Sequence, residues 1–170
     1  RDVAPSRGLG DVYKRQISEE GAAQAVKIYR DYYETKGQFE AHLYDGIKEV
    51  LEKLSHDPNK KIYITTSKNE PTALEMCEYL GITEFFDGIY GATPTAFHKA
   101  DILQRAITEN QAPKYQSVIV GDTKFDLIGG KTVGIKTIAV TWGFGTNETL
   151  LAENPDFVTE TPQELWDILK

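Results

Sequence analysis

An acidic pair that follows a short apolar run is the strongest candidate for chemistry in this sequence. The stretch V-I-V-G-D-T-K-F-D-L-I-G-G (118–130) leads through Gly121 to Asp122 and Asp126. Magnesium ions prefer one or two carboxylates and take their other ligands from water and substrate oxygens. Asp122 and Asp126 are therefore predicted to hold Mg2+. The spacing alone is equally compatible with a helix N-cap and an exposed helical aspartate.

Hydroxyl groups end a second apolar run, I-Y-I-T-T (62–66). Thr66 closes the run, and Ser67 and Lys68 come directly after it. Hydroxyls and backbone N–H groups ahead of a helix suit a phosphate oxygen. We expect Thr66, Ser67 and Lys68 to contact a phosphate, with a hydroxyl-rich helix cap as the plain alternative.

Two further apolar runs are followed by residues that have both a functional and a structural interpretation. Lys99 follows the run G-I-Y-G-A (88–92), and its ammonium group can neutralise a phosphate. A solvated surface lysine is the plain alternative. The glycine-rich W-G-F-G (142–145) could border a site, but a simple turn is the favoured interpretation.

Apolar spacing and end signals predict helices that alternate with short strands. Helices are expected over 18–36, 45–54, 71–80, 99–109, 127–133, near 149 and over 162–169, and strands over 62–66, 88–92, 117–121, 136–141 and 156–158. This alternation predicts an α/β fold, a Rossmann-like parallel sheet with helices on both faces. Ligands of such sheets lie beyond the carboxyl ends of the strands. The candidate residues are therefore expected at one edge of one sheet.

The composition argues against several classes of partner. A formal net charge of −7 disfavours nucleic acid and anionic membranes, which attract basic surfaces. No apolar run approaches the roughly 20 residues that span a bilayer. A single cysteine, Cys77, allows no internal disulfide, so a reducing compartment and a cytoplasmic location are predicted.

The first residues are interpreted as a non-native tail. Residues 1–16, R-D-V-A-P-S-R-G-L-G-D-V-Y-K-R-Q, show neither helical nor strand periodicity. D-V-Y-K-R-Q is what the mosaic-end DNA of transposase-made sequencing libraries encodes, and the preceding residues continue the same adapter. A flexible natural tail is the alternative. We exclude this segment from the fold and expect the natural sequence to begin at Ile17, inside a longer protein.

From Ile17 onward the sequence resembles the haloacid dehalogenase-like (HAD) hydrolase superfamily, closest to its phosphoglycolate phosphatase-like branch. The matching blocks are L-Y-D-G-I-K-E-V-L (43–51), I-T-T-S-K (64–68), H-K-A-D-I-L (98–103), V-I-V-G-D-T-K-F-D-L-I-G-G (118–130), and the tail from V-T-W-G-F-G to D-F-V-T-E-T-P-Q-E-L (140–165). The resemblance implies a HAD-like core over 43–170 and the remnant of a helical cap over 17–42.

The resemblance also implies a mechanism. In this family an aspartate attacks the phosphorus of a phosphate monoester and forms an aspartyl-phosphate, and a second aspartate two residues later serves as acid and base. By match, Thr66 would donate a hydrogen bond to a phosphoryl oxygen and Lys99 would neutralise charge, which makes both catalytic. Asp122 would hold Mg2+, with Asp126 acting directly or through water. The implied substrate is a small phosphorylated metabolite, as for a phosphoglycolate phosphatase or a 5'-nucleotidase.

The sequence departs from the family in one decisive respect. The motif D-x-D-G-T, which ends the family's first strand, is absent from the 170 residues. Asp11, Val12 and Tyr13 cannot replace it, because they lie in the tail and lack the second aspartate and the glycine. Without that central strand, two neighbouring strands keep unpaired backbone groups, each costing about 1–3 kcal/mol when buried. The chain is therefore predicted to be poorly stable and to lack phosphatase activity.

Other functions remain open. A phospho-signalling receiver domain also places Asp, Thr and Lys around Mg2+, but its acidic pair comes first, whereas Thr66 and Lys99 precede Asp122 here. An inactive HAD-like regulatory or binding protein fits the sequence, and so do a phosphosugar mutase and a pyrophosphatase of the same superfamily. A dehalogenase fits less well, because that chemistry does not require the cation.

Overall fold

The computed structural model describes residues 18–35 and 37–170, which fall into two compact units. The first contains helix α2 (Glu19–Thr35) and the short 3-10 helix η1 (Gly37–Glu40). The second begins at His42. The segment interpreted as an adapter-derived tail lies outside the described residues.

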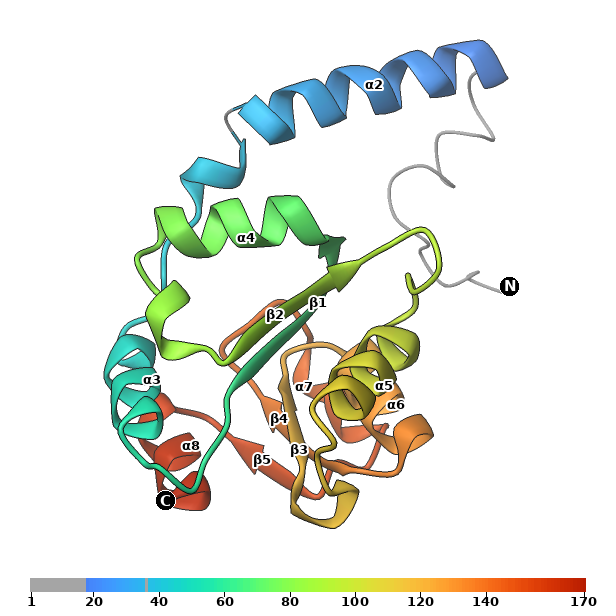
Figure 1. Cartoon of the computed structure of the whole chain (residues 1–170). Coiled ribbons are helices and arrows are strands. Elements are labelled where there is room, and N and C mark those ends of the chain that lie inside the picture. The colour runs from blue at the N-terminus through green and yellow to red at the C-terminus, as the bar shows by residue number, and fades with distance from the viewer. Residues whose placement is uncertain (1–17, 36) are drawn as a thin grey trace. The chain divides into compact units, whose positions relative to one another are not determined.

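Helices and strands alternate through the second unit, His42–Lys170 (Figure 1). In chain order they are α3 (Ile47–Ser55), β1 (Tyr63–Asn69), α4 (Glu70–Tyr79), β2 (Gly88–Ala92), α5 (Lys99–Glu109), β3 (Val118–Gly121), α6 (Lys124–Val133), β4 (Lys136–Val140), α7 (Asn147–Leu151), β5 (Phe157–Thr159) and α8 (Pro162–Leu169). Two 3-10 turns, η2 (Thr83–Phe85) and η3 (Lys114–Gln116), complete the unit. The predicted α/β fold is confirmed, and α6 begins three residues earlier than expected.

The strands form two parallel sheets, where the sequence led us to expect one. β1 pairs with β2, and β3, β4 and β5 form a separate sheet in that order. Across residues 18–35 and 37–170, no strand pairs with the edge of β1 that faces away from β2, or with the edge of β3 that faces away from β4. Nothing described joins β1 to β3, and these open edges agree with the unpaired strands predicted from the absence of the D-x-D-G-T strand.

Helices cover both faces of the strands, as the fold class requires (Figure 1). On one face, α5 and α6 pack on β3 through the cluster Leu103, Ile107, Ile119, Val133 and Ile135. On the other face, α8 and α3 pack on β4 through Ile138, Val140, Leu165, Ile47, Trp142 and Leu169. β4 is buried on both faces, since Thr137 to Val140 are each at most 7% exposed, which explains why this strand is a continuous run of mostly apolar residues.

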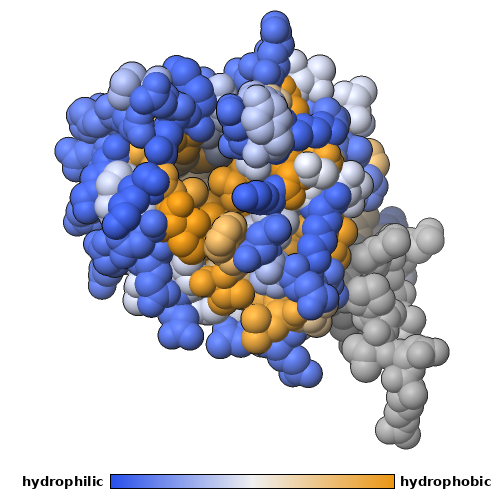
Figure 2. Space-filling view, turned by 90° about the horizontal axis from the view of Figure 1, so that it is seen from below, coloured by the Kyte–Doolittle hydropathy of each residue, from blue (hydrophilic) through white to orange (hydrophobic). Residues whose placement is uncertain are grey.

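The open edge of β3 leaves apolar side chains uncovered. Val118 and Val120 are 36% and 39% exposed, whereas Ile119 between them is buried. Val120 also lines a cavity of about 260 Å³. The other lining residues are Tyr44, Ile47, Gly121, Asp122, Val140, Trp142, Gly143 and Leu165. Figure 2 shows apolar surface gathered in the middle of one face of the molecule, between hydrophilic margins.

A carboxylate fixes the start of β5 against β4. The Oδ2 atom of Asp156 accepts hydrogen bonds from the backbone N–H of Thr137 at 2.8 Å and from its hydroxyl at 2.9 Å. These two bonds, first of all the one from the backbone, favour the ionised form and hold the pKa of Asp156 below its ordinary value.

This bond makes part of the stability pH-dependent. Because the folded-state pKa is lowered, the contribution is present at neutral pH and is lost as the pH falls below about 4. Asp156→Asn is expected to lower the melting temperature at pH 7 by a few degrees. The loss in free energy of unfolding is less than about 1 kcal/mol, because the carboxylate is exposed. Melting curves of both chains at several pH values test this, and a gap that stays constant down to pH 3 would contradict it.

Candidate active site

Lys99 connects the two sheets. It is the first residue of α5, and its Nζ atom donates a hydrogen bond to the carbonyl oxygen of Thr65 in β1 at 2.7 Å. The same atom lies 2.8 Å from Oδ1 of Asp126 on α6, and both side chains of this ion pair are nearly buried. Thr65 is the last residue of β1 in regular register with β2, before the register shift in this strand, and Asp126 follows β3. The carboxyl ends of the two sheets therefore meet at Lys99.

Asp126 is held from its other side by Thr123, the N-cap of α6. Its Oδ2 atom accepts hydrogen bonds from the backbone N–H of Thr123 at 3.1 Å and from the Thr123 hydroxyl at 2.7 Å, in a capping box. Asp126 is only 7% exposed, so the alternative of an exposed helical aspartate is excluded. Sequence reasoning missed Thr123, although a threonine three residues before an acidic residue is the spacing of a capping box.

Asp122 is held by the W-G-F-G segment. Its Oδ2 atom accepts the backbone N–H of Phe144 at 2.9 Å, and its carbonyl oxygen accepts the N–H of Gly145 at 2.9 Å. A Cβ atom at Gly143 would lie 2.2 Å from the Cβ atom of Asp122, so only glycine allows this approach. W-G-F-G is therefore a turn, as the favoured interpretation had it, and this turn also holds Asp122 in place.

The hydroxyl segment Thr66–Lys68 lies inside β1, which extends three residues beyond the predicted end of the strand, and it is partly organised around Lys99. Thr66 directly follows the residue whose carbonyl accepts the Lys99 ammonium, and its hydroxyl oxygen accepts the N–H of Lys68 at 3.2 Å. Lys68 is half-buried and Ser67 is exposed. In the described part of the chain, no hydrogen bond joins Ser67 to Lys99 or to the acidic pair.

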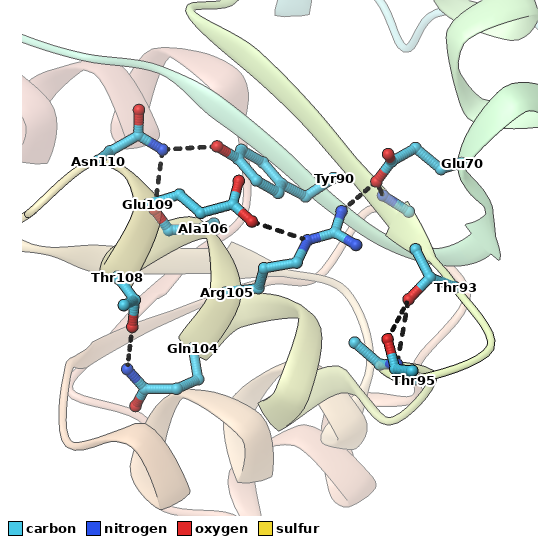
Figure 3. Close-up of polar contacts among 12 residues, drawn as sticks. Glu70, Tyr90, Thr93, Thr95, Gln104, Arg105, Ala106, Thr108, Glu109 and Asn110 are labelled. Carbon is cyan, nitrogen blue, oxygen red and sulfur yellow. Dashed lines mark hydrogen bonds and ion pairs between the residues drawn. The ribbon is translucent and has the colours of Figure 1, made fainter.

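A second ion pair fixes the helix that follows this segment (Figure 3). Glu70, the first residue of α4, accepts the backbone N–H of Gly91 in β2 at 2.9 Å and pairs with the guanidinium group of Arg105 on α5. That guanidinium lies 5.0 Å from the ring centroid of Tyr90, a cation–π distance. α4, β2 and α5 are thus joined at one point. No local sequence pattern predicts this pairing, because Glu70 and Arg105 are 35 residues apart.

The donor set of the acidic pair fits a magnesium ion that keeps most of its water. No group of three or more His, Cys, Asp or Glu side chains able to hold a metal occurs among the described residues. Both oxygens of Asp126 are engaged, whereas Oδ1 of Asp122 has no hydrogen-bond partner within this part of the chain. Asp122 also lines the cavity next to β3. One available carboxylate oxygen is enough for Mg2+, which needs few protein ligands.

Known proteins are similar to this chain in sequence. The family described as haloacid dehalogenase-like hydrolase matches residues 7–140. A phosphoglycolate phosphatase of Vibrio parahaemolyticus is 29% identical over 172 residues, which cover 99% of this chain and 75% of the relative. A 5'-nucleotidase of Pseudomonas aeruginosa is 30% identical over 141 residues, 82% of this chain and 63% of the relative.

A solved structure extends the likeness to three dimensions. A haloacid dehalogenase-like family hydrolase of Streptococcus pneumoniae matches with a TM-score of 0.89 and 41% identity, over 97% of this chain and 78% of that one. The family match begins inside residues 1–16, and the adapter origin of that segment stays a prediction.

Proposed function

Because the chain belongs to the haloacid dehalogenase-like hydrolase family, we propose that it is the core of a Mg2+-dependent phosphate-monoester hydrolase. In the proposed reaction, the first aspartate of a D-x-D-G-T motif attacks phosphorus and the leaving oxygen departs with a proton from the second. Water then hydrolyses the aspartyl-phosphate. The substrate is a small phosphorylated metabolite, and the names of the relatives, phosphoglycolate phosphatase and 5'-nucleotidase, support that class.

Residues 66–68 of β1 and the first residue of α5 bind the phosphate. The hydroxyl oxygen of Thr66 already accepts the N–H of Lys68, so its proton remains available for a phosphoryl oxygen. Ser67 and Lys68 contact the same phosphate, and the ammonium group of Lys99 neutralises its charge. Donors fixed in place before the reaction stabilise the charge that develops on the transferring group.

Asp122 and Asp126 have different proposed roles. Asp122 holds the cation through its available carboxylate oxygen, and Asp126 contributes through water while it fixes Lys99 in place. Bound Mg2+ would supply Lewis-acid stabilisation of the phosphoryl oxygens. The observation that carries the proposal is the position of Lys99 Nζ, 2.7 Å from the carbonyl oxygen of Thr65 and 2.8 Å from Asp126. This position brings the proposed phosphate-binding residues of β1 close to the proposed metal-binding carboxylates.

We also propose that the 170-residue chain does not turn over substrate by itself, because its sequence contains no D-x-D-G-T. The open edges of β1 and β3 and the exposed side chains of Val118 and Val120 support this. One parallel strand placed between the two edges would pair with both of them. If the nucleophile strand lies there, its carboxyl end comes next to Lys99. In this proposal the core spans 43–170 and α2 belongs to a helical cap.

A role without catalysis is the second candidate, because an inactive HAD-like regulatory protein would also lack D-x-D-G-T. A phosphosugar mutase of the same superfamily is a further alternative. The chimaera described in the Discussion separates these functions by its products: hydrolysis releases phosphate, whereas a mutase returns a rearranged phosphosugar.

The proposed location and partners rest on the helices and on the net charge. No helix in the part of the chain that the structure describes is long and apolar enough to cross a bilayer. The formal net charge of −7 disfavours nucleic acid as a partner. We propose a cytoplasmic protein that acts on a small soluble phosphate ester.

The magnesium site can be tested on the chain alone, because Trp142 lines the same cavity as Asp122. In a Trp166→Phe background, which leaves Trp142 as the only tryptophan, Mg2+ is expected to change the fluorescence in a saturable way. Asp122→Asn should abolish the change, and Asp101→Asn, a substitution of an exposed aspartate, should preserve it. Saturable binding that survives Asp122→Asn would contradict the proposed site.

A further inference from the structure

Gly129 lies where the side chain of Lys99 crosses helix α6. A Cβ atom at this buried position would lie 2.7 Å from Cγ of Lys99 and 3.3 Å from its Cβ. Contacts under 3.0 Å force a neighbour to move. The side chain of Lys99 thus lies directly on the glycine backbone.

Space, rather than backbone conformation, explains the glycine. The positive-φ glycines of the described chain are Gly46, Gly81 and Gly134, so Gly129 has an ordinary helical backbone that alanine would adopt more readily. A glycine inside a helix weakens it, and at Gly129 the observed compensation is the room left for Lys99.

The spacing along α6 connects this room to the ion pair. Gly129 and Asp126 are three residues apart and so lie on the same face of the helix. The Lys99 stem crosses α6 at Gly129, and its ammonium group reaches Asp126 one turn nearer the start of the helix. Lifting the stem would move Nζ away from both Asp126 and the carbonyl oxygen of Thr65.

We propose that Gly129 is a positioning residue for Lys99, and that the absence of a side chain at this position places the ammonium group between Thr65 and Asp126. The inference rests on the proposed function only in giving Lys99 its role toward phosphate. The geometric effect on Lys99 holds in the chain as it stands.

Urea unfolding measures the energetic coupling between Gly129 and Lys99. A stabilising osmolyte is added so that each variant is folded before urea is added. Gly129→Ala is expected to raise the unfolding equilibrium constant about tenfold or more, since overpacking at a buried contact is costly. In a Lys99→Ala/Asp126→Asn background, which lacks the Lys99 stem and leaves no unpaired carboxylate, the same substitution should no longer raise it.

Gly130→Ala is the matched control. It is the neighbouring buried glycine, and its Cβ would meet Ile119 and Thr137 at 2.5 and 2.7 Å instead of Lys99. Its cost should be equal in both backgrounds. A Gly129→Ala cost that persists without the Lys99 stem overturns the proposal. If Gly129→Ala alone does not fold, recovery of folded protein in the background supports the proposal, and failure there overturns it.

A second measurement separates positioning from packing. When Nζ leaves Asp126, that carboxylate loses a competing positive charge, so Gly129→Ala should bind Mg2+ at least about threefold more tightly, and Gly130→Ala should not. Unchanged affinity in Gly129→Ala overturns the positioning role. Failure of Mg2+ to bind any variant counts against the proposed metal site, while the unfolding comparison still decides the role of Gly129.

Discussion

A chimaera that supplies a D-x-D-G-T strand is expected to hydrolyse p-nitrophenyl phosphate, whereas the 170-residue chain is not. In it, residues 1–16 are replaced by the segment of the Streptococcus pneumoniae relative that ends just before its counterpart of Ile17; this chain matches that relative at 41% identity. Turnover should rise by roughly four orders of magnitude or more, since removing a nucleophile costs that much in other enzymes. Released phosphate, measured with and without Mg2+, is the readout.

The physical reason lies in the two open edges. A strand between β1 and β3 would pair their unmatched backbone groups, cover Val118 and Val120, and end beside Lys99. The chimaera should therefore also melt at a higher temperature than the original chain.

The control is the same chimaera with the first aspartate of D-x-D-G-T changed to asparagine. It should keep the gain in melting temperature and lose the turnover. Activity in this control, or in the 170-residue chain, would show that the nucleophile has been assigned wrongly. A chimaera that is folded, binds Mg2+ and hydrolyses no phosphate ester would favour the regulatory candidate instead.

Lys99→Met is expected to lower the free energy of unfolding by about 3–5 kcal/mol, a large share of the stability of a typical domain. The substitution keeps the apolar stem and removes the ammonium group. It leaves Asp126, 7% exposed, without its cation, and it removes the hydrogen bond that Lys99 donates to the carbonyl oxygen of Thr65. Urea unfolding in a stabilising osmolyte measures the loss, and adding Asp126→Asn should recover part of it.

Lys61→Met is the matched comparison. Lys61 pairs with Asp87 at 2.7 Å, close to the 2.8 Å of the Lys99 pair, but its side chain is 67% exposed. Exposed ion pairs contribute little to stability, because water and salt screen them, so Lys61→Met should cost much less than Lys99→Met. Equal losses from Lys99→Met and Lys61→Met would mean that the buried pair does not hold the sheets together.

Local signals in the sequence were sufficient for the helices and strands. β2 (Gly88–Ala92), α5 (Lys99–Glu109) and α8 (Pro162–Leu169) begin and end at the residues predicted. Their ends are marked by residues close in sequence, such as Thr161, whose hydroxyl caps α8 by accepting the N–H of Glu164. The start of α6 was missed because the capping box at Thr123 was not recognised.

Contacts between residues far apart in the sequence could not be predicted from local patterns. The open strand edges that divide the strands into two sheets were predicted only from the missing D-x-D-G-T strand, and not from a local pattern in V-I-V-G. The bonds from Phe144 to Asp122 and from Arg105 to Glu70 join residues 22 and 35 positions apart. The candidate residues themselves were found because parallel strands bring their carboxyl ends together, but the pairing of Lys99 with Asp126 needed the folded chain.

The open edge of β3 also affects how the chain behaves in concentrated solution. An unpaired strand edge with exposed apolar side chains is a template for pairing with another molecule. Val118 and Val120 give this edge no charge that would repel a second copy, and the short strand that they form limits the contact. The net charge of −7 acts against association over longer distances and weakens as salt is added. Aggregation should therefore compete with refolding most strongly at high protein concentration and high ionic strength.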